Sequence, residues 1–383
     1  MWFFWRRKRE DERKEKQDER ACVLSVPGQY ATIQEAVDAA ARGSTVIVQP
    51  GRYRETVDFR GNDITVRSED PNDPKIVART IIDAGGSGSV VSFCSGETEE
   101  ARLNGFTLTG GRGDFYGSPA GGGVTVTNGS GPTIENNVIV GNMSELDGGG
   151  IFVDDSWPVI VRNRIVDNEA AGCGGGIHVG WDSARAEPRR ELRAAEDIAV
   201  HLDKAFPGSF HIAAVEDEPE SSLTGLITQW EDISEEERKE RPRPRIESNA
   251  VRGNSALSGG GLHISDESPL VNGNVFQRNR AGRGGGICFW DNCRAVVSGN
   301  HVIANEAREE GGGAIVEWGA APAIIRNRFS ENTSGRGRDL SVMENSAPVI
   351  RLNHFAAERG DAVFRWENSR ANMEDNRFAG EDR

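Results

Sequence analysis

The feature that most constrains this chain is an asparagine that returns at nearly constant intervals, each time inside a short segment of the same pattern. The clearest copies are PTIENNVIVGN from Pro132, PVIVRNRIVDN from Pro158, PRIESNAVRGN from Pro244 and PLVNGNVFQRN from Pro269; weaker copies begin at Ala295, Pro322, Pro348 and Ala371. The central asparagines are Asn137, Asn163, Asn249, Asn274, Asn300, Asn327, Asn353 and Asn376, spaced 26, 86, 25, 26, 27, 26 and 23 residues apart. A fixed period of this length is typical of repeat proteins, in which neighbouring units stack on one another.

A second motif, three consecutive glycines, shares the register of the asparagines. The triplets occupy residues 121–123, 148–150, 174–176, 259–261, 284–286 and 311–313. Because two unrelated motifs keep one period, each period is predicted to be one structural unit.

Three positions in each period are nearly always apolar. One row follows the glycines (Ile151, Ile177, Leu262, Ile287, Leu340), a second lies two residues after the proline (Ile134, Ile160, Ile246, Val271, Val297, Ile324, Ile350), and a third follows the asparagine (Ile139, Ile165, Val251, Phe276, Val302, Phe329, Phe355, Phe378). Three inward rows predict three strands per turn. Turns stacked at ~4.8 Å would bury one continuous core, with the asparagines at the bends and their amides bonded from turn to turn. The sequence therefore predicts an all-β solenoid of parallel strands.

The first part of the solenoid is predicted to carry a helical cap. Thr32 with Glu35 three residues later forms a capping-box pattern, and Ile33, Ala36, Val37 and Ala40 fall on one helical face. Short β-branched runs follow at residues 45–48, 64–66 and 81–82, and glycines separate them.

Composition excludes several classes of protein. The chain of 383 residues has a formal net charge of −15, which disfavours nucleic acid as a partner. A hydrophobic content of 36% excludes a bundle of transmembrane helices. The five cysteines are an odd number without zinc-ligand spacing, so they indicate neither a complete disulfide framework nor a structural metal.

The predicted domain organisation has four parts: a charged tail at 1–21, a first solenoid part with its cap at 22–183, an insert at 184–243, and a second solenoid part at 244–383. In the tail, aromatic residues 2–5 precede a basic cluster, the reverse of a secretory signal, and predict at most a weak membrane contact. The insert lacks the repeat and has helical spacing at 191–206 and 223–239 around a strand-like run at 210–215. We expect a small α/β lobe that overhangs one face of the solenoid and walls a pocket.

These repeats resemble those of right-handed parallel β-helix proteins of the pectate-lyase-like superfamily, in particular bacterial parallel β-helix repeat proteins. The motifs at 312–315 (GGAI), 276–279 (FQRN) and 329–332 (FSEN) are also similar to repeats of chlamydial polymorphic outer-membrane proteins, and TIQEAVDAAARG with GRYRETV is similar to the start of pectin methylesterases. The resemblance implies a right-handed β-helix and an extracellular or envelope location. It implies no catalytic residues, because the catalytic segments of pectin methylesterases, polygalacturonases and pectate lyases have no copy here.

Candidate site residues lie on the outward row, whose members directly follow those of the inward row after the glycine triplets, and just beyond it. His178 and His263 occupy consecutive turns beside the root of the insert, and Cys288 is the next residue of that row and a candidate third metal ligand. An acidic and aromatic row comes next: Asp154, Asp155, Trp181, Asp182, Asp266, Glu267, Trp290, Asp291, Glu317, Trp318, Glu344, Trp366 and Glu367. Tryptophan faces stack on sugar rings, and paired carboxylates serve as general acid and base or hold Ca²⁺ against an anionic glycan. Asp and Asn are also common at bends for local hydrogen bonding alone, so a purely architectural role stays open.

A second face carries a basic strip, formed by Arg162, Arg164, His301, Arg326, Arg328, His354 and Arg377. On an acidic protein such a strip could bind a polyanionic polysaccharide along the solenoid, and it could equally be a solvated side whose charge prevents edge association.

Two functions are therefore compatible with the sequence. The first is a noncatalytic module that binds carbohydrate or forms a surface scaffold, with Trp181, Trp290, Trp318, Trp366, Arg326 and Arg328 in contact with the glycan. The second is a polysaccharide lyase or glycosidase with its cleft beside the insert, in which His178, Asp182, His263, Asp266 and Asp291 carry the chemistry. The absence of recognisable catalytic motifs favours the first, and an insert over one place of a regular solenoid favours the second.

Overall fold

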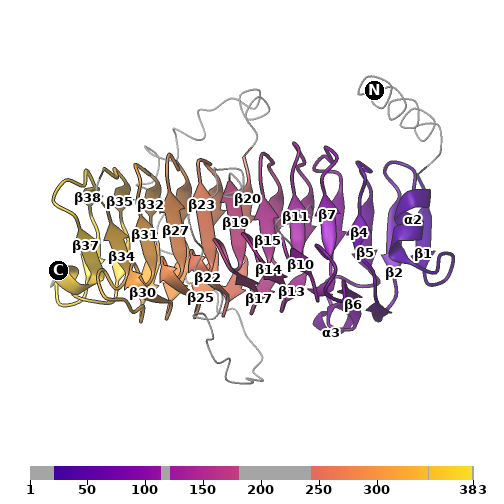
Figure 1. Ribbon diagram of the computed structural model, residues 1–383, viewed down its shortest axis with the longest axis horizontal. Coiled ribbons are helices and arrows are strands. Elements are labelled where there is room, and N and C mark those ends of the chain that lie inside the picture. The colour runs from indigo at the N-terminus through magenta and orange to yellow at the C-terminus, as the bar shows by residue number, and fades with distance from the viewer. Residues whose placement is uncertain (1–20, 114–120, 181–242, 344, 382–383) are drawn as a thin grey trace. The chain divides into compact units, whose positions relative to one another are not determined.

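The computed structural model describes residues 21–113, 121–180, 243–343 and 345–381. Its strands pair in parallel with the equivalent strand one turn earlier and one turn later, so the chain winds as a solenoid (Figure 1). The fold class predicted from the repeats, an all-β parallel solenoid, is confirmed.

Two long sheets run through the described solenoid. Sheet A has twelve strands: β1 (Val23–Val26), β2 (Thr45–Val48), β5 (Thr65–Ser68), β8 (Arg102–Asn104), β12 (Thr133–Glu135), β16 (Val159–Val161), β20 (Arg245–Glu247), β24 (Leu270–Asn272), β28 (Val296–Ser298), β32 (Ala323–Ile325), β35 (Val349–Arg351) and β38 (Asn372–Glu374). Sheet B has eleven: β3 (Gly51–Tyr53), β6 (Thr80–Asp83), β9 (Thr107–Thr109), β13 (Val138–Val140), β17 (Arg164–Val166), β21 (Ala250–Arg252), β25 (Val275–Gln277), β29 (His301–Ile303), β33 (Arg328–Ser330), β36 (His354–Phe355) and β39 (Arg377–Phe378).

Two further sheets complete the turns. Sheet C has ten strands: β4 (Val57–Asp58), β7 (Val91–Phe93), β11 (Val124–Val126), β15 (Ile151–Val153), β19 (Ile177–Gly180), β23 (Leu262–Ser265), β27 (Ile287–Trp290), β31 (Ala314–Val316), β34 (Leu340–Val342) and β37 (Val363–Arg365). Sheet D has six: β10 (Arg112–Gly113), β14 (Met143–Ser144), β18 (Glu169–Ala170), β22 (Ser255–Ser258), β26 (Arg280–Arg283) and β30 (Glu306–Glu310).

Sheet D corrects the prediction of three strands per turn, because the central turns have four. Its strands carry no row of large apolar residues; the buried side chains of β14, β18 and β30 are Ser144, Ala170 and Ala307. Without a branched apolar residue at a fixed position, these strands produce no hydrophobic pattern in the sequence.

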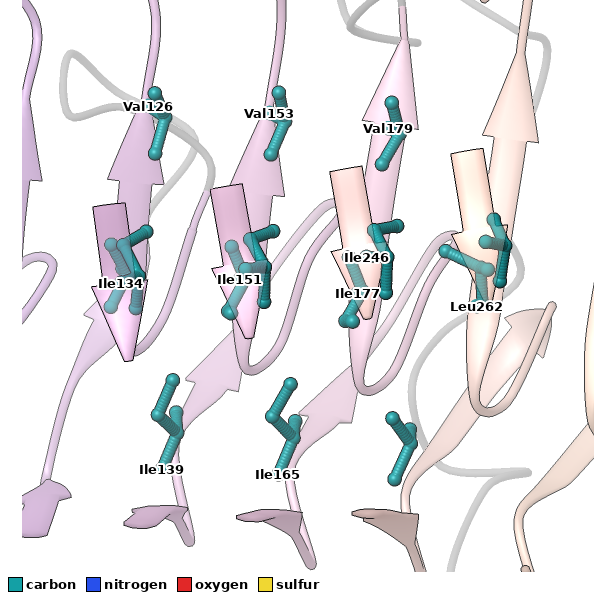
Figure 2. Packing of buried hydrophobic residues seen from close by; sticks show 14 of the residues in the cluster. Val126, Ile134, Ile139, Ile151, Val153, Ile165, Ile177, Val179, Ile246 and Leu262 are labelled. Carbon is teal, nitrogen blue, oxygen red and sulfur yellow. The ribbon is translucent and has the colours of Figure 1, made fainter. Parts of the chain in front are cut away.

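The core is a set of stacked apolar columns from sheets A, B and C. Ile134 pairs with Ile160 in sheet A. Ile139 pairs with Ile165 in sheet B, and Ile151 pairs with Ile177 in sheet C (Figure 2). All six side chains are buried. The rows predicted from the period are therefore confirmed as the interior of the solenoid.

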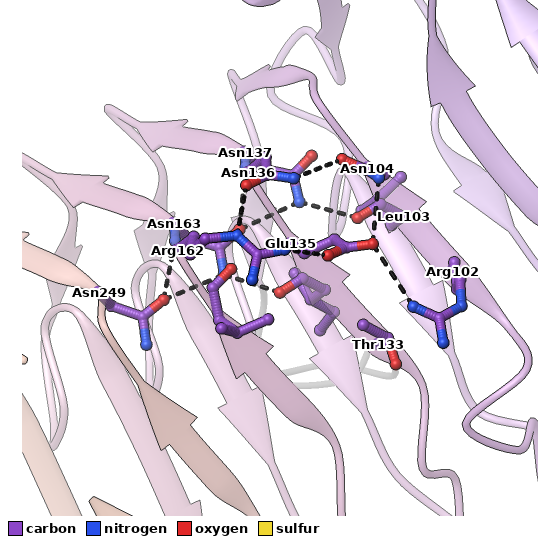
Figure 3. A network of polar contacts seen from close by, with 12 residues as sticks. Arg102, Leu103, Asn104, Thr133, Glu135, Asn136, Asn137, Arg162, Asn163 and Asn249 are labelled. Atoms are coloured by element: carbon purple, nitrogen blue, oxygen red, sulfur yellow. Dashed lines mark hydrogen bonds and ion pairs between the residues drawn. The ribbon is translucent and has the colours of Figure 1, made fainter. Parts of the chain in front are cut away.

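The predicted asparagine ladder forms at the bend between sheets A and B. The backbone N–H and the side-chain amide of Asn137 both donate to Oδ1 of Asn163, and those of Asn163 donate to Oδ1 of Asn249 (Figure 3). The same pattern continues from turn to turn to Asn376. Each asparagine side chain thus provides hydrogen-bond partners for polar groups at one bend and connects this bend to that of the neighbouring turn.

A second asparagine ladder, which the sequence analysis did not single out, lies at the end of the sheet B strands. Its members are Asn142, Asn168, Asn254, Asn279, Asn305 and Asn332, bonded in the same way. Every member is the last residue of a repeat segment or its FxxN equivalent.

The glycine triplets lie where the chain enters sheet C and passes close to its own neighbouring turns. A Cβ on Gly150 would lie 2.5 Å from the carbonyl oxygen of Gly176 and 2.8 Å from the Ile165 side chain. The first glycine of the triplet, Gly148, has φ +68°, a backbone conformation that side chains disfavour. Glycine is therefore required at these positions by the stacking itself.

Three helices are described: α2 (Ile33–Ala39), α3 (Pro74–Val77) and α6 (Arg359–Ala362). Helix α2 is the predicted cap: the Thr32 hydroxyl accepts from the Glu35 N–H, and the Glu35 carboxylate accepts from the Thr32 N–H. Ile33, Ala36 and Val37 are buried in the same core as sheets A and C. No helix within the described ranges is both long and apolar enough to cross a membrane.

Candidate functional site

Trp181, Asp182 and Glu344, together with all but the last residue of the predicted insert, lie outside the described residues. The α/β lobe, and a pocket beneath it, therefore stay predictions. The remaining candidate residues fall on two faces of the solenoid, the outer face of sheet C and the outer face of sheet B.

His178 and His263 lie directly opposite each other on β19 and β23, as their places in consecutive turns predict. Their imidazole rings are 5.2 Å apart and nearly parallel, at 7°. Both side chains are buried, with 1% and 3% of their surface exposed. Both ring nitrogens of His178 lack a hydrogen-bond partner within the described parts of the chain.

The burial of the histidines corrects the expectation of an open outward row on sheet C. The first glycine of each triplet lies against this row: a Cβ on Gly174 would be 2.8 Å from Cα of His178, and one on Gly259 would be 2.8 Å from Cβ of His263. Cys288, the next member of the row, is also fully buried. Returning backbone thus covers the row, which sequence periodicity alone did not reveal.

The outer face of sheet C carries a continuous series of ring contacts. Beyond the histidine pair, Phe152 stacks on His178 at 5.3 Å, His263 approaches Trp290 at 6.3 Å, and Trp290 approaches Trp318 at 5.4 Å. The series begins at the buried Phe152 and ends at Trp318, which is 64% exposed. Trp290 and Trp318 are thus brought together as an accessible pair. Trp366 contacts Phe364 instead, at 6.1 Å.

Trp318 holds a backbone conformation that its residue type disfavours. Its φ is +56°, in the left-handed region. At the corresponding position of other described turns the left-handed residues are Asn or Asp, which tolerate this region: Asn128, Asp155, Asp266 and Asp291. A bulky, exposed side chain at such a position carries strain without gaining burial, which is characteristic of functional positions.

The acidic row is held by local hydrogen bonds. The Asn292 side-chain amide donates to Oδ1 of Asp266 and to Oδ1 of Asp291, at 3.1 Å in each case. Burial, with a contribution from the negative charges of Asp155 and Asp154, raises the pKa of Glu267. The carboxylates of bends two turns apart therefore lie close enough to repel one another.

The structure brings together Arg283, Cys288 and Glu317, a cluster that the sequence does not indicate. Nη1 of Arg283 lies 2.7 Å from Oε2 of Glu317, and the Cys288 thiol donates to Oε1 of Glu317 at 3.6 Å. Glu317 is 1% exposed, and burial raises its pKa to about 7 although Arg283 opposes the shift. Burial also raises the pKa of Cys288 well above its usual range, so this thiol is not a poised nucleophile. Arg283 precedes one glycine triplet and Glu317 follows another, so no single motif links them.

No group of three or more His, Cys, Asp or Glu side chains with metal-binding geometry occurs within the described residues. Cys288 directs its thiol to Glu317 and belongs to a buried cluster with Ile315 and Met343. The prediction that it completes a metal site with the histidines is therefore not supported by its contacts. None of the five cysteines forms a disulfide bond within the described residues.

The outer face of sheet B carries a basic ladder, which we define as His301, Arg328, His354 and Arg377. These four residues occupy the same register position in four successive strands, β29, β33, β36 and β39. At ~4.8 Å per strand the ladder extends over about 14 Å. Neither Arg328 nor Arg377 makes an ion pair within the part of the chain that the structure describes.

Other members of the predicted basic strip differ from the ladder. Arg162 pairs with Glu135, next to Arg102, which also approaches Glu135 (Figure 3). Arg164 shares the register column of the ladder, but Ala250 and Val275 separate it from His301. Arg326 lies at the bend before Arg328, half-buried and with φ +54°. In this register column, adjacent basic residues therefore occur only in the last four described turns.

Parallel strands stacked in columns, with asparagine ladders at their bends and a helix at one end, define this molecule as a parallel β-helix. Residues 238–382 match the family model described as "Right handed beta helix region". The match covers the second part of the solenoid, and the fold agrees with the resemblance to the pectate-lyase-like superfamily. No curated protein matches the chain.

Proposed function

We propose that this β-helix protein binds an acidic polysaccharide along the outer face of sheet B. The observation that carries the proposal is the basic ladder, because Arg328 and Arg377 lie two strands apart in one register column and neither makes an ion pair within the described residues. A ligand with negative charges would compensate both.

The negative net charge of the chain limits where on its surface an anionic ligand can bind. A formal charge of −15 repels polyanions from most of the surface, so an anionic ligand is attracted only where basic residues gather. The ladder is one side chain wide and follows the solenoid axis, which suits a single extended chain. The other outward positions of β29 and β33 are Ile303 and Ser330, which offer no large aromatic ring for stacking a nucleobase.

The accessible pair Trp290 and Trp318 supports a second contact for the same class of ligand. Aromatic faces bind the apolar face of sugar rings, and the strained backbone of Trp318 favours a role other than folding. Asp266 and Asp291 lie at the equivalent bends of the two preceding turns, where they could accept hydrogen bonds from sugar hydroxyls or share Ca²⁺ with an anionic glycan. A ligand of this kind favours an extracellular or envelope location for the protein.

Titration calorimetry of the full chain with polygalacturonate, alginate, a sulfated glycan and a neutral glucan tests the proposal. We expect binding of at least one acidic polysaccharide, and a loss of about tenfold in affinity in the double variant Arg328→Gln/Arg377→Gln, since removal of two charge contacts costs roughly 1.4 kcal/mol. Arg164→Gln is the matched control, because it removes the same charge from the same column outside the ladder.

Equal affinity of the double variant and the wild type would overturn the proposal, as would tighter binding of duplex DNA. Trp318→Ala, measured with the same ligands, reports whether the tryptophan pair contributes. Reducing ends and unsaturated uronate absorbance are followed in parallel; if both stay constant during binding, the noncatalytic function holds, whereas cleavage abolished by Asp266→Ala or Asp291→Ala would establish the enzyme instead.

A further inference from the structure

The basic ladder alternates two kinds of cation. In the order of the turns it reads histidine, arginine, histidine, arginine, each directly opposite the next. Arginine keeps its charge at every physiological pH, whereas a histidine gains its charge only in mildly acidic solution. The number of positive charges in the row therefore depends on pH.

We infer that the ladder is a pH-dependent binding surface, on which only Arg328 and Arg377 hold an acidic polysaccharide at neutral pH and His301 and His354 join them on acidification. This inference rests on the proposed function, and it adds a regulation that the fold and the family match do not imply.

The surroundings of the two histidines support this behaviour. His301 lies between Val275 of β25 and Arg328 of β33, and His354 lies between Arg328 and Arg377 of β39. Burial and then the positive charge of Arg328 lower the pKa of His301, and burial, Arg328 and Arg377 lower the pKa of His354. Both imidazoles are therefore mostly neutral at pH 7.

The nearest acidic residue along the chain does not neutralise the ladder. Asp375 precedes Arg377 at the bend, but its carboxylate pairs with Arg351 of sheet A at 3.4 Å. Arg326 at the preceding bend adds a further positive charge beside Arg328. The charged groups that act on the two histidines are thus positive, and an anionic ligand would supply the missing negative charge.

Linkage gives the direction of the effect. A bound polyanion favours the protonated form of each histidine, so the complex takes up protons that the free protein does not hold. By reciprocity, lowering the pH through the range in which the histidines titrate strengthens binding. Raising the pH weakens binding to the affinity that Arg328 and Arg377 provide by themselves.

The test uses dextran sulfate, because its sulfate groups stay ionised across the pH range, and titration calorimetry of the full chain at pH 7.5 and pH 5. We expect affinity at pH 5 to exceed that at pH 7.5 by at least about fivefold. A further titration at pH 6, carried out in two buffers of different ionisation enthalpy, should reveal proton uptake on binding.

The deciding variant is His301→Gln/His354→Gln. It should lose most of the strengthening of binding that the wild type shows between pH 7.5 and pH 5, and it should take up fewer protons on binding. Its carboxylates are those of the wild type, so any pH effect of the overall negative charge is retained and is subtracted by the comparison. The same double substitution at His201 and His211 of the insert is the matched control and should leave the pH dependence intact.

The possible outcomes distinguish failure of the proposed polysaccharide binding from failure of its regulation by pH. If the wild type binds no polyanion at either pH, the proposed function is wrong. If it binds equally at both, or if the His301/His354 variant keeps the full pH dependence, the polysaccharide surface stands and its regulation by the ladder is refuted.

Discussion

At the scale of single residues, the solenoid keeps a few side chains that its own stacking does not require. Glu317 is buried in contact with Arg283 and Cys288, and Trp318, its neighbour in sequence, is exposed in a left-handed backbone. Burying a carboxylate is unfavourable unless it is paired, and a tryptophan gains nothing from an exposed bend. Both residues therefore mark this bend as different from its neighbours.

Glu317 predicts an unusual pH dependence of stability. Since burial raises its pKa to about 7, the folded state holds this proton more tightly than the unfolded state does. Its contribution is complete below the unfolded pKa of about 4.3 and is lost as the pH rises through 7, by about 2 kcal/mol between pH 5 and 7.5. Urea denaturation at both pH values should show a smaller difference for Glu317→Gln than for the wild type.

The control for this measurement is Glu309→Gln. Glu309 also approaches Arg283, at 3.7 Å, but its side chain is 62% exposed. We expect Glu309→Gln to retain the pH dependence of the wild type. A Glu317→Gln variant with unchanged pH dependence would show that another group is responsible.

At the scale of elements, the asparagine ladders connect the turns. Asn274 is buried; it donates to the carbonyl of Ile246 at 2.7 Å, and its Oδ1 accepts from both the backbone and the side chain of Asn249. Its removal takes these partners from two buried backbone groups of the preceding turn, the Ile246 carbonyl and the Asn249 N–H.

Asn274→Ala should therefore lower the free energy of unfolding by about 2–4 kcal/mol. Chemical denaturation measures the change, and Asn272→Ala is the control, because Asn272 is an exposed residue of β24 whose amide oxygen accepts only from the Ser298 hydroxyl at 3.1 Å among the described contacts. We expect that control to change stability by less than about 0.5 kcal/mol. Equal effects of the two substitutions would contradict a structural role for the ladder.

At the scale of the whole molecule, the register of the solenoid continues across the insert. Ile160 pairs with Ile246, and His178 pairs with His263, in the same way as residues of turns without an insertion. In a repeat protein each turn depends mainly on its immediate neighbours. The two strands flanking the insert therefore need only a connection of ordinary length.

A variant in which a short Gly- and Asn-containing turn replaces residues 184–243 should fold. We expect its circular dichroism spectrum to keep the β signature and its Tm to stay within a few degrees of that of the wild type. A chain that fails to fold, or that melts far below the wild type, would show that the insert stabilises the solenoid. Titration of the folded variant with the polysaccharides also tests whether binding requires the insert.

The sequence by itself determined the solenoid, its period, its inward rows, its helical cap and the pairing of histidines from consecutive turns. These properties follow from residues that recur at one interval, and periodicity is directly visible in a sequence. Sheet D could not be predicted from the sequence, because its buried side chains, such as Ser144 and Ala170, are small and produce no hydrophobic pattern.

Only the tertiary structure decided which outward residues are accessible and which charges are compensated. Backbone of the glycine triplets covers His178 and His263, and Glu135 compensates Arg162 while Arg328 and Arg377 stay in the uncompensated ladder. The physical reason is that exposure and charge pairing depend on contacts between turns and between sheets, which residue order along one turn does not contain.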